Sequence, residues 1–519
     1  MMRPAQKRVA DALEAYIKQP RFGHAQWGLQ VVDLDTGKLL FQHNADKLFI
    51  PASNTKLYTA ALALSVLGPR FRFHTSLFAS RVPSANGVLH GSLVLYGRGD
   101  PALGQGNNTQ PPNDWADRLA SALRLRGVRV VHGDIIADDT YYSGPPFGSG
   151  WEANDLENSY APGVSALSVQ GNSFTLALGG SGQCCTVRTD PAAVVHVVNT
   201  LHAPSGSQAT AASDADATGS YDPLGLYRAP GSDRLYVFGS RRPSAVPRIF
   251  TLSAPDPARL AGSLLADALT RQGIRLTGRI RVLHWPNAGT PDDGRHLIHI
   301  SDIRSPPLSD LVGHMLKESD NLYAQLLLMA VGKRTSVSGV CVDQKHPPTL
   351  TANWGLCAMR ALMRRIGEPN GSLHLEEGSG LSRKDLVTPE ATTHLLAWIQ
   401  RQPFGGIVRK ALPEAGMNGT LEYRLQGPLT EGRVQAKTGT LHYAYALSGY
   451  VTAANGAHLV FSIMLNNYAR PLDTSGMSVA PRPQHDIDAL TTIIAGYGTA
   501  GNATLPGHAE PAQTVQSVH

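Results

Sequence analysis

The first third of the chain shows hydrophobic positions with two different periods. Residues 7–17 place apolar side chains on one face at helical spacing, which predicts an amphipathic helix. Residues 27–43 (WGLQVVDLDTGKLLFQH) form two apolar runs on either side of a Thr-Gly turn, which predicts a β-hairpin. Residues 54–67 (NTKLYTAALALSVL) are apolar on every side and precede Gly-Pro, which predicts a buried helix that ends there.

The pattern changes between about residues 76 and 289, where short strand-like runs and glycines predominate. Two stretches, 115–133 and 260–278, each pass from an apolar helix into a short strand and a glycine. They indicate a small α+β subdomain, with coincidence as the alternative. The tract 203–220 (APSGSQATAASDADATGS) is typical of a loop or a disordered segment.

Helical periodicity returns after about residue 300, and strands return in the last third, over 434–440, 441–453 and 458–467. A closing helix is predicted over 484–497. Strands from both ends of the chain can therefore join in one mixed sheet, with terminal helices packed on one face.

This organisation predicts three parts. Residues 1–75 plus 290–498 form the main domain, and 76–289 form an inserted region, which we divide into two subdomains. Residues 499–519 form a disordered polar tail.

Composition excludes several classes of protein. The chain has 519 residues, 42% hydrophobic and 17% charged, so it is globular and too long for a single compact core. The net charge of +6 includes no block of Lys and Arg, and we expect no nucleic-acid partner. No apolar run has the length of a membrane span, although the mild positive charge is compatible with peripheral contact with a membrane surface or an anionic wall polymer.

The four cysteines form no C-x-x-C motif, which argues against a zinc site. Cys341 and Cys357 are candidates for a disulfide in a secreted protein, and two unpaired thiols are the alternative. The first residues show no signal-peptide core. The expectation is either a cytoplasmic chain or an export signal that has been removed or lies outside this sequence.

The first candidate for chemistry is Ser53-Asn54-Thr55-Lys56, at the start of the buried helix. Positions i and i+3 of a helix share a face, so the Lys56 amine can approach the Ser53 hydroxyl. A serine needs such a base to act as a nucleophile, and burial favours the neutral amine that can serve as one. The alternative is a capping serine with a surface lysine.

The second candidate is Ser319-Asp320-Asn321, at a predicted break between two helices. The Ser319 hydroxyl can relay a proton, while the Asn321 carboxamide can hold a substrate amide and the lysine. The alternative is an ordinary helix cap.

The third candidate is Lys437-Thr438-Gly439, in a strand-like run. Lys437 offers a fixed cation, the Thr438 hydroxyl can bind a carboxylate, and Gly439 lets a ligand approach the backbone closely. The alternative is an edge strand with an exposed lysine.

Together and in this order, the three motifs match the Ser-x-x-Lys, Ser-Asp-Asn and Lys-Thr-Gly set of β-lactamases and penicillin-binding proteins. The segments PASNTK (51–56), KESDN (317–321), EGSGLSR (377–383) and QAKTGT (435–440) resemble the class C, low-molecular-mass penicillin-binding proteins of the D-alanyl-D-alanine carboxypeptidase/endopeptidase type. The long separation between the first two motifs fits that group, which has a large insertion there.

The resemblance implies an α+β fold of the penicillin-recognising, β-lactamase/transpeptidase-like type, with an antiparallel sheet flanked by helices and a large inserted α+β region. It implies a serine hydrolase that cleaves the terminal D-Ala-D-Ala bond of peptidoglycan stem peptides, with D-alanyl cross-links as a further candidate substrate and β-lactams as covalent inhibitors. No metal or organic cofactor is expected.

The resemblance also implies the roles of the motif residues. Ser53 is the nucleophile, Lys56 its base, Ser319 the proton shuttle and Asn321 a substrate anchor. Lys437 and Thr438 would hold the terminal carboxylate, with Gly439 beside them. The backbone N–H groups of Ser53 and Thr440 would form the oxyanion hole.

Two further segments resemble the family without a chemical step. EGSGLSR is expected to lie near the site, with a simple glycine turn as the alternative. Asp155, in WEAND, is a candidate for substrate contact, with an exposed loop as the alternative.

Two other functions stay open. A Ser-x-x-Lys esterase or β-lactamase-like hydrolase shares the nucleophile, and a penicillin-binding sensor would acylate with little turnover. The resemblance implies a periplasmic location, although the sequence shows no signal peptide. The oligomeric state is not predicted.

Overall fold

The computed structural model resolves the chain into two compact units. Unit 1 consists of Met1–Asn54, Val387–Arg401 and Leu412–His519, and unit 2 of Thr55–Leu386 and Gln402–Ala411. The structure describes residues 4–106, 111–112, 114–180, 183–192, 194–203, 224–241, 247–287, 297–338, 341, 348–472 and 478–499. Nearly all of the predicted loop 203–220 and of the predicted tail 499–519 lies outside the described residues.

Unit 1 is built on a five-stranded sheet in the order β19-β20-β21-β1-β2. All neighbouring strands are antiparallel, with Trp27 of β1 opposite Leu465 of β21. The two ends of the chain therefore share a sheet, as the pattern of strands predicted, and the sheet is antiparallel, as the family resemblance implied, and not mixed. The strands are β1 (Gln26–Asp33), β2 (Leu39–His43), β19 (Val434–Leu441), β20 (Ala444–Thr452) and β21 (His458–Asn466).

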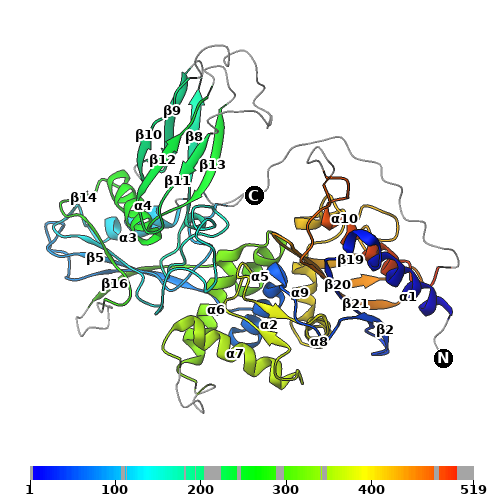
Figure 1. The fold of residues 1–519 in the computed structure, drawn as a ribbon. Coiled ribbons are helices and arrows are strands. Elements are labelled where there is room, and N and C mark those ends of the chain that lie inside the picture. The colour runs from blue at the N-terminus through cyan, green and yellow to red at the C-terminus, as the bar shows by residue number, and fades with distance from the viewer. Residues whose placement is uncertain are drawn as a thin grey trace. The chain divides into compact units, whose positions relative to one another are not determined.

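Helices cover both faces of this sheet because its strands are apolar on both sides. Alternate residues of β1, among them Leu29, join a core with α1 (Pro4–Ile17) and α10 (Pro483–Ala495), which Figure 1 shows as the blue and orange helices beside the sheet. Gln30 points to the other face, where it accepts a hydrogen bond from Thr393 of α8 (Pro389–Gln400). Short 3₁₀ turns complete the unit: η1 (Pro20–Phe22), η2 (Ala52–Asn54) and η5 (Gly419–Leu421).

Unit 2 contains a helical half built around α2 (Thr55–Leu67). Every residue of α2 from Thr55 to Leu64 is buried, as expected of a helix that is apolar on all sides. It packs against α5 (Leu308–Lys317), α6 (Asn321–Thr335) and α7 (Thr351–Arg365). The other elements of this half are α9 (Gly405–Ala411), which packs on α5, and the short strand β17 (Leu373–His374). The chain then passes into unit 1 within β18 (Leu386–Val387).

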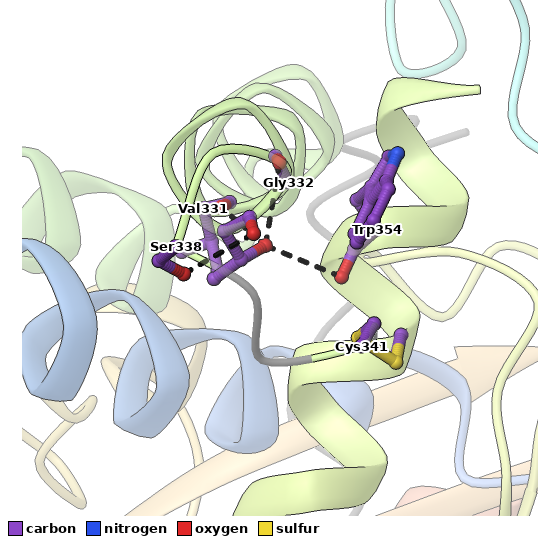
Figure 2. Close-up of a disulfide and its surroundings, with 7 residues drawn as sticks. Val331, Gly332, Ser338, Cys341 and Trp354 are labelled. Atoms are coloured by element: carbon purple, nitrogen blue, oxygen red, sulfur yellow. Dashed lines mark hydrogen bonds between the residues drawn. A yellow bond between two sulfur atoms is a disulfide. The ribbon is translucent and has the colours of Figure 1, made fainter. Parts of the chain in front are cut away.

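Helices α6 and α7 lie close together and are joined covalently (Figure 2). A Cβ atom at Gly332 would clash with the Thr351 carbonyl oxygen, so glycine is needed at this contact. Cys341, after α6, forms a disulfide with Cys357 of α7, which decides between the two alternatives for these cysteines.

The remainder of unit 2 is the α+β region between the helices α2 and α5. Its largest sheet has the order β15-β7-β5-β3-β16, in which β3, on entry to the region, pairs antiparallel with β16, on exit. Three-stranded sheets β14-β6-β4, β13-β8-β9 and β10-β12-β11 complete it, and the last two rise as long ribbons in Figure 1. The strands and helices of the region are β3 (His74–Ala79), β4 (Val88–Leu89), β5 (Leu93–Tyr96), α3 (Asp114–Leu125), β6 (Val130–Val131), β7 (Ile135–Asp138), η3 (Gln170–Asn172), β8 (Ser173–Gly180), β9 (Gln183–Asp190), β10 (His196–Asn199), β11 (Gly225–Tyr227), β12 (Arg234–Phe238), β13 (Arg248–Ser253), α4 (Pro257–Arg271), β14 (Arg275–Leu276), β15 (Ile280–Leu283) and β16 (Ile298–Arg304).

The two helix-to-strand units noted in the sequence lie side by side in this region. Helix α3 packs on α4, β14 runs parallel to β6, and β15 runs parallel to β7. The predicted boundaries of the inserted region, 76 and 289, stay a prediction, because unit 2 also includes the helices that follow. Within the described part of the chain, no helix is both long enough and apolar enough to cross a membrane.

Candidate active site

Ser53 lies in unit 1, in the 3₁₀ turn η2 that precedes α2. The turn is held against the sheet by Asn54, whose Nδ2 donates to the Ser448 hydroxyl of β20 at 2.8 Å. Ala52 adopts a left-handed backbone conformation (φ 47°), which is costly for a residue with a side chain and is typical of functional turns. This strained turn places Ser53 beside the edge strand β19, which η2 contacts.

Lys437, Thr438, Gly439 and Thr440 lie on β19, the edge strand of the unit 1 sheet. A Cβ atom at Gly439 would come within 2.6 Å of the Pro51 carbonyl oxygen, so glycine lets the Ser53 turn approach this strand. The sequence predicted a close approach at Gly439 but assigned it to a ligand. In the structure, the backbone before Ser53 makes that approach.

Lys437 lies on an edge strand, but its side chain is fully buried. The alternative interpretation, an exposed lysine on an edge strand, was therefore right about the strand and wrong about the exposure. Its Nζ donates to the Thr438 carbonyl at 2.9 Å. The Thr438 hydroxyl lies 2.7 Å from that of Thr420 in η5, a partner that sequence analysis missed. Thr440, two residues further along β19, is exposed.

Lys56 lies in unit 2, in the first turn of α2, and none of its surface is exposed. Its Nζ donates to Asn321 Oδ1 at 2.5 Å and to the Ser379 carbonyl at 2.7 Å. Burial lowers the pKa of Lys56 to about 8, although the nearby carboxyl groups of Glu377, Asp320 and Asp385 oppose that change. About a tenth of the amine is therefore neutral at pH 7, far more than for a lysine with the ordinary pKa, and only the neutral form can serve as a general base.

Ser319-Asp320-Asn321 lies between α5 and α6, as predicted from the sequence. Asp320 caps α6 by accepting the Tyr323 N–H at 3.0 Å, so the helix-cap alternative describes Asp320 correctly. Ser319 has φ 61°, a strained left-handed conformation. Asn321, in the first turn of α6, turns its carboxamide to Lys56 and donates from Nδ2 to the Tyr160 carbonyl at 2.8 Å.

Asp155 belongs to the loop that meets Asn321. Its Oδ1 accepts a hydrogen bond from the Tyr160 hydroxyl at 2.9 Å, and Tyr160 in turn contacts Asn321 through its carbonyl. Two residues, Tyr160 and Asn321, therefore link Asp155 to Lys56 through hydrogen bonds. Asp155 itself is half-buried. The same loop is tied to the EGSGLSR segment by an ion pair between Glu152 and Arg383 at 2.9 Å.

The EGSGLSR segment lies directly beside Lys56, which sequence analysis expected without giving it a role. Ser379 supplies the carbonyl that accepts from Lys56, and the Gly378 carbonyl accepts from Thr59 of α2 at 2.6 Å. Glu377 and Asp385 are both fully buried here. In the sequence, the signal for the Glu377 carboxyl group was an acidic residue at the start of a run of small residues.

The predicted site residues thus fall into two sets. Unit 1 brings Ser53 close to the strand that carries Lys437–Thr440, and unit 2 brings Lys56, Asn321 and the Asp155 loop together. The chain passes from one set to the other between Asn54 and Thr55. A serine and a buried lysine belong to the first set, and a second buried lysine with a nearby carboxamide belongs to the second.

In the described ranges, no three or more His, Cys, Asp or Glu side chains are arranged to hold a metal ion.

Comparison with known proteins agrees with the motif analysis. The model of the D-Ala-D-Ala carboxypeptidase 3 (S13) family matches residues 9–487. A D-alanyl-D-alanine carboxypeptidase of Actinomadura sp. (strain R39) is 32% identical over 467 residues, which cover 89% of this chain and 81% of that protein. The D-alanyl-D-alanine carboxypeptidase DacB of Haemophilus influenzae is 26% identical over 447 residues, 85% of each chain.

Solved structures give the same result for the fold. Penicillin binding protein 4 (dacB) from Haemophilus influenzae superposes with a TM-score of 0.75 at 23% identity, over 96% of this chain and 100% of that one. The same protein complexed with a β-lactam superposes with a TM-score of 0.69 at 23% identity, over 94% and 98% of the two chains. The predicted α+β fold of the penicillin-recognising type is confirmed.

Proposed function

Because the chain belongs to the D-Ala-D-Ala carboxypeptidase 3 (S13) family, we propose that it hydrolyses the terminal D-Ala-D-Ala bond of peptidoglycan stem peptides through an acyl-enzyme on Ser53. One observation carries the mechanism. A buried amine with a pKa of about 8, hydrogen-bonded to Asn321, lies three residues after the serine.

In acylation, the Ser53 Oγ attacks the carbonyl carbon of the penultimate D-alanine, and its proton passes to the neutral Lys56 amine. The C–N bond then breaks as the protonated Lys56 returns that proton, through the Ser319 hydroxyl, to the leaving amine, which departs as D-alanine and leaves Lys56 neutral. A water molecule next attacks the ester, which releases the shortened peptide and returns the proton to Ser53. These steps require that Ser53, Lys56 and Ser319 act on the same substrate molecule.

The other residues of the two sets would bind the substrate. Lys437 and Thr438 receive the terminal carboxylate, and the N–H groups of Ser53 and Thr440 receive the oxyanion, with Gly439 keeping this strand accessible to the turn. In a comparable hydrolase, one N–H donor of the oxyanion hole stabilises the transition state by about 2.7–4 kcal/mol.

Asn321 is proposed to hold the substrate backbone while it orients Lys56. Its Oδ1 and Nδ2 each already have a partner, but a carboxamide oxygen accepts twice and its nitrogen donates twice. One donor and one acceptor position therefore stay available for a peptide group. Asp155 is proposed to contact the substrate beyond that peptide group, because Tyr160 links it to Asn321.

β-Lactams are proposed to acylate Ser53 and to leave slowly, as the complex of the Haemophilus influenzae protein with a β-lactam suggests by analogy. We place the protein in the periplasm. The Cys341–Cys357 disulfide supports this location, because such bonds persist in oxidising compartments.

Labelling with a fluorescent penicillin tests the nucleophile. Wild type is expected to be labelled, and Ser53→Ala is expected to lose all label, since loss of the nucleophile costs on the order of 10⁶-fold in another serine hydrolase. Ser65→Ala is the matched control, because Ser65 lies on α2 with its hydroxyl bonded to the Ala61 carbonyl. Label on Ser53→Ala would show that the nucleophile is assigned wrongly.

Turnover separates the remaining alternatives. Release of D-alanine from a pentapeptide ending in D-Ala-D-Ala is expected of the carboxypeptidase. Labelling without release would indicate a sensor, and hydrolysis of simple esters or of penicillin alone would indicate the esterase or β-lactamase-like function. The products from cross-linked muropeptides measure any endopeptidase activity.

A further inference from the structure

Two buried carboxyl groups lie beside Lys56 and have no step in the proposed mechanism. Glu377 and Asp385 are both 0% exposed, and they lie on the two sides of the short loop that carries Ser379. Two ionised carboxylates in contact inside a protein repel each other strongly, so such a pair usually retains a proton. The question is which of the two groups holds it.

Glu377 has the surroundings of a charged carboxylate. Its Oε2 accepts the Ser379 N–H at 2.7 Å, and its Oε1 accepts the N–H of Gly380 and, at 3.0 Å, that of Leu381. Three backbone donors on one carboxyl group stabilise the ionised form. The loop therefore folds around Glu377 as around an anion.

Asp385 has weaker support for a charge. It accepts one backbone N–H, from Glu376 at 2.7 Å, and lies 3.4 Å from the Thr55 hydroxyl. Burial and the adjacent Glu377, to which its side chain is hydrogen-bonded, raise the pKa of Asp385 well above its ordinary value. Asp385 is the proton holder of the pair.

The pair is connected to Lys56 through the loop itself. The Ser379 N–H donates a hydrogen bond to Glu377, and the Ser379 carbonyl oxygen accepts one from Lys56 Nζ. Thr55, next to Lys56, reaches Asp385 with its hydroxyl. A single residue, Ser379, therefore connects the Glu377 carboxylate to the Lys56 amine.

We propose that Glu377 and Asp385 share one proton, so that one fixed negative charge, on Glu377, faces Lys56 and sets the pH range over which Lys56 acts as a base. Glu377 is a positioning residue, because it acts on the reaction through Lys56. This role rests on the proposed function, whereas the shared proton does not.

The charge that opposes the burial of Lys56 comes from two elements of unit 2. Asp320, at the start of α6, and Glu377, on the loop, both favour the protonated amine. Burial alone would lower the pKa of Lys56 further than to about 8. Glu377 therefore keeps the amine from losing its proton too readily, so that it can both take the proton of Ser53 and return it.

Infrared spectroscopy of the intact protein tests the shared proton. At pH 9, wild type is expected to show the C=O stretch of a protonated carboxylic acid, and Asp385→Asn is expected to lose it. Asp100→Asn is the control, because burial raises the pKa of Asp100 only to about 7 and that group is ionised at pH 9. Absence of the band in wild type, or its survival in Asp385→Asn, would overturn the proposal.

The pH dependence of penicillin acylation tests the effect on Lys56. In Glu377→Gln, which removes the charge, the midpoint of the acid limb is expected to fall by about one pH unit or more. In Asp385→Asn, which replaces one neutral hydrogen-bonding group by another, the midpoint is expected to stay within about 0.3 units of wild type. Glu376→Gln is the matched control, because Glu376 is the adjacent acid and is exposed.

Two results would overturn this part of the proposal. A rate that falls equally at every pH in Glu377→Gln would make Glu377 a purely structural support. An equal shift in Asp385→Asn would mean that both carboxyls are ionised. If wild type is not acylated at all, the proposed function fails, and the infrared result still decides the state of the pair.

Discussion

The two buried lysines of the candidate site are held in different ways. Lys56, in unit 2, binds a side-chain amide and a loop carbonyl, and nearby acidic side chains favour its charged form. Lys437, in unit 1, occupies a fixed register on β19 opposite Ser448 and donates to the backbone of its own strand. Neither side chain is exposed.

This difference fits the different roles proposed for the two lysines. A lysine that must exchange a proton needs surroundings that adjust its pKa, and charged neighbours supply them. A lysine that only presents a cation needs a rigid position, and a strand ladder supplies that. The matched substitutions below separate the two requirements, because arginine keeps the charge but cannot give up a proton.

The largest effect is expected for Lys56→Arg. The guanidinium group stays charged at every accessible pH, so the base is lost, and we expect acylation by penicillin to fall about 10²–10⁴-fold. Stopped-flow measurement of the acylation rate checks this, with circular dichroism to confirm folding. A variant that retains most of its rate would show that Lys56 serves as a cation and not as a base.

Lys437 is expected to give the opposite pattern. Lys437→Met should lower acylation about 10²-fold, because a fixed charge that stabilises the bound carboxylate is removed. Lys437→Arg should recover part of that loss. The same rate measurement compares the two variants, and equal defects in both would mean that the shape of this lysine matters more than its charge.

The pH dependence of wild type follows from Lys56. Only the neutral amine accepts the Ser53 proton, and its fraction rises with pH through a pKa of about 8. Acylation at pH 7 should therefore be about tenfold slower than on the alkaline plateau. A rate profile from pH 6 to 10 measures the midpoint, and a midpoint near 10.5, the ordinary lysine value, would contradict the assignment.

The smallest effect is expected for Thr420→Val. The substitution removes the hydroxyl that lies 2.7 Å from that of Thr438, and a hydrogen bond of this kind is worth about 0.5–1.5 kcal/mol. Acylation should fall about 2–10-fold with no change in the midpoint of the pH profile. A shifted midpoint would show that unit 1 also influences the lysine base, and would weaken the comparison.

Sequence patterns predicted those features that depend on neighbours along the chain. The apolar run after Lys56 predicted its burial, and the break between two helices located Ser319 and Asn321. The strands near both termini predicted a shared sheet, whereas its antiparallel direction came only from the family resemblance, because periodicity shows which face is buried and not which way a strand runs.

Contacts between distant segments were less accessible. Nothing near Gly439 indicates that Pro51 approaches it, and nothing near Asn321 indicates the carbonyl of Tyr160. EGSGLSR was noticed, but the turn that points three N–H groups back at Glu377 becomes visible only in three dimensions. Such features depend on backbone conformation, which a single sequence encodes only indirectly.

The path of the chain between the units has a practical consequence. Unit 1 is assembled from three separate stretches and unit 2 from two, so the polypeptide changes unit four times. No single cut in the gene yields either unit by itself, and homologous exchange of one unit between relatives requires several simultaneous junctions. One of these junctions separates the serine from its lysine, so a hybrid protein joined there would inherit its nucleophile from one parent and its base from the other.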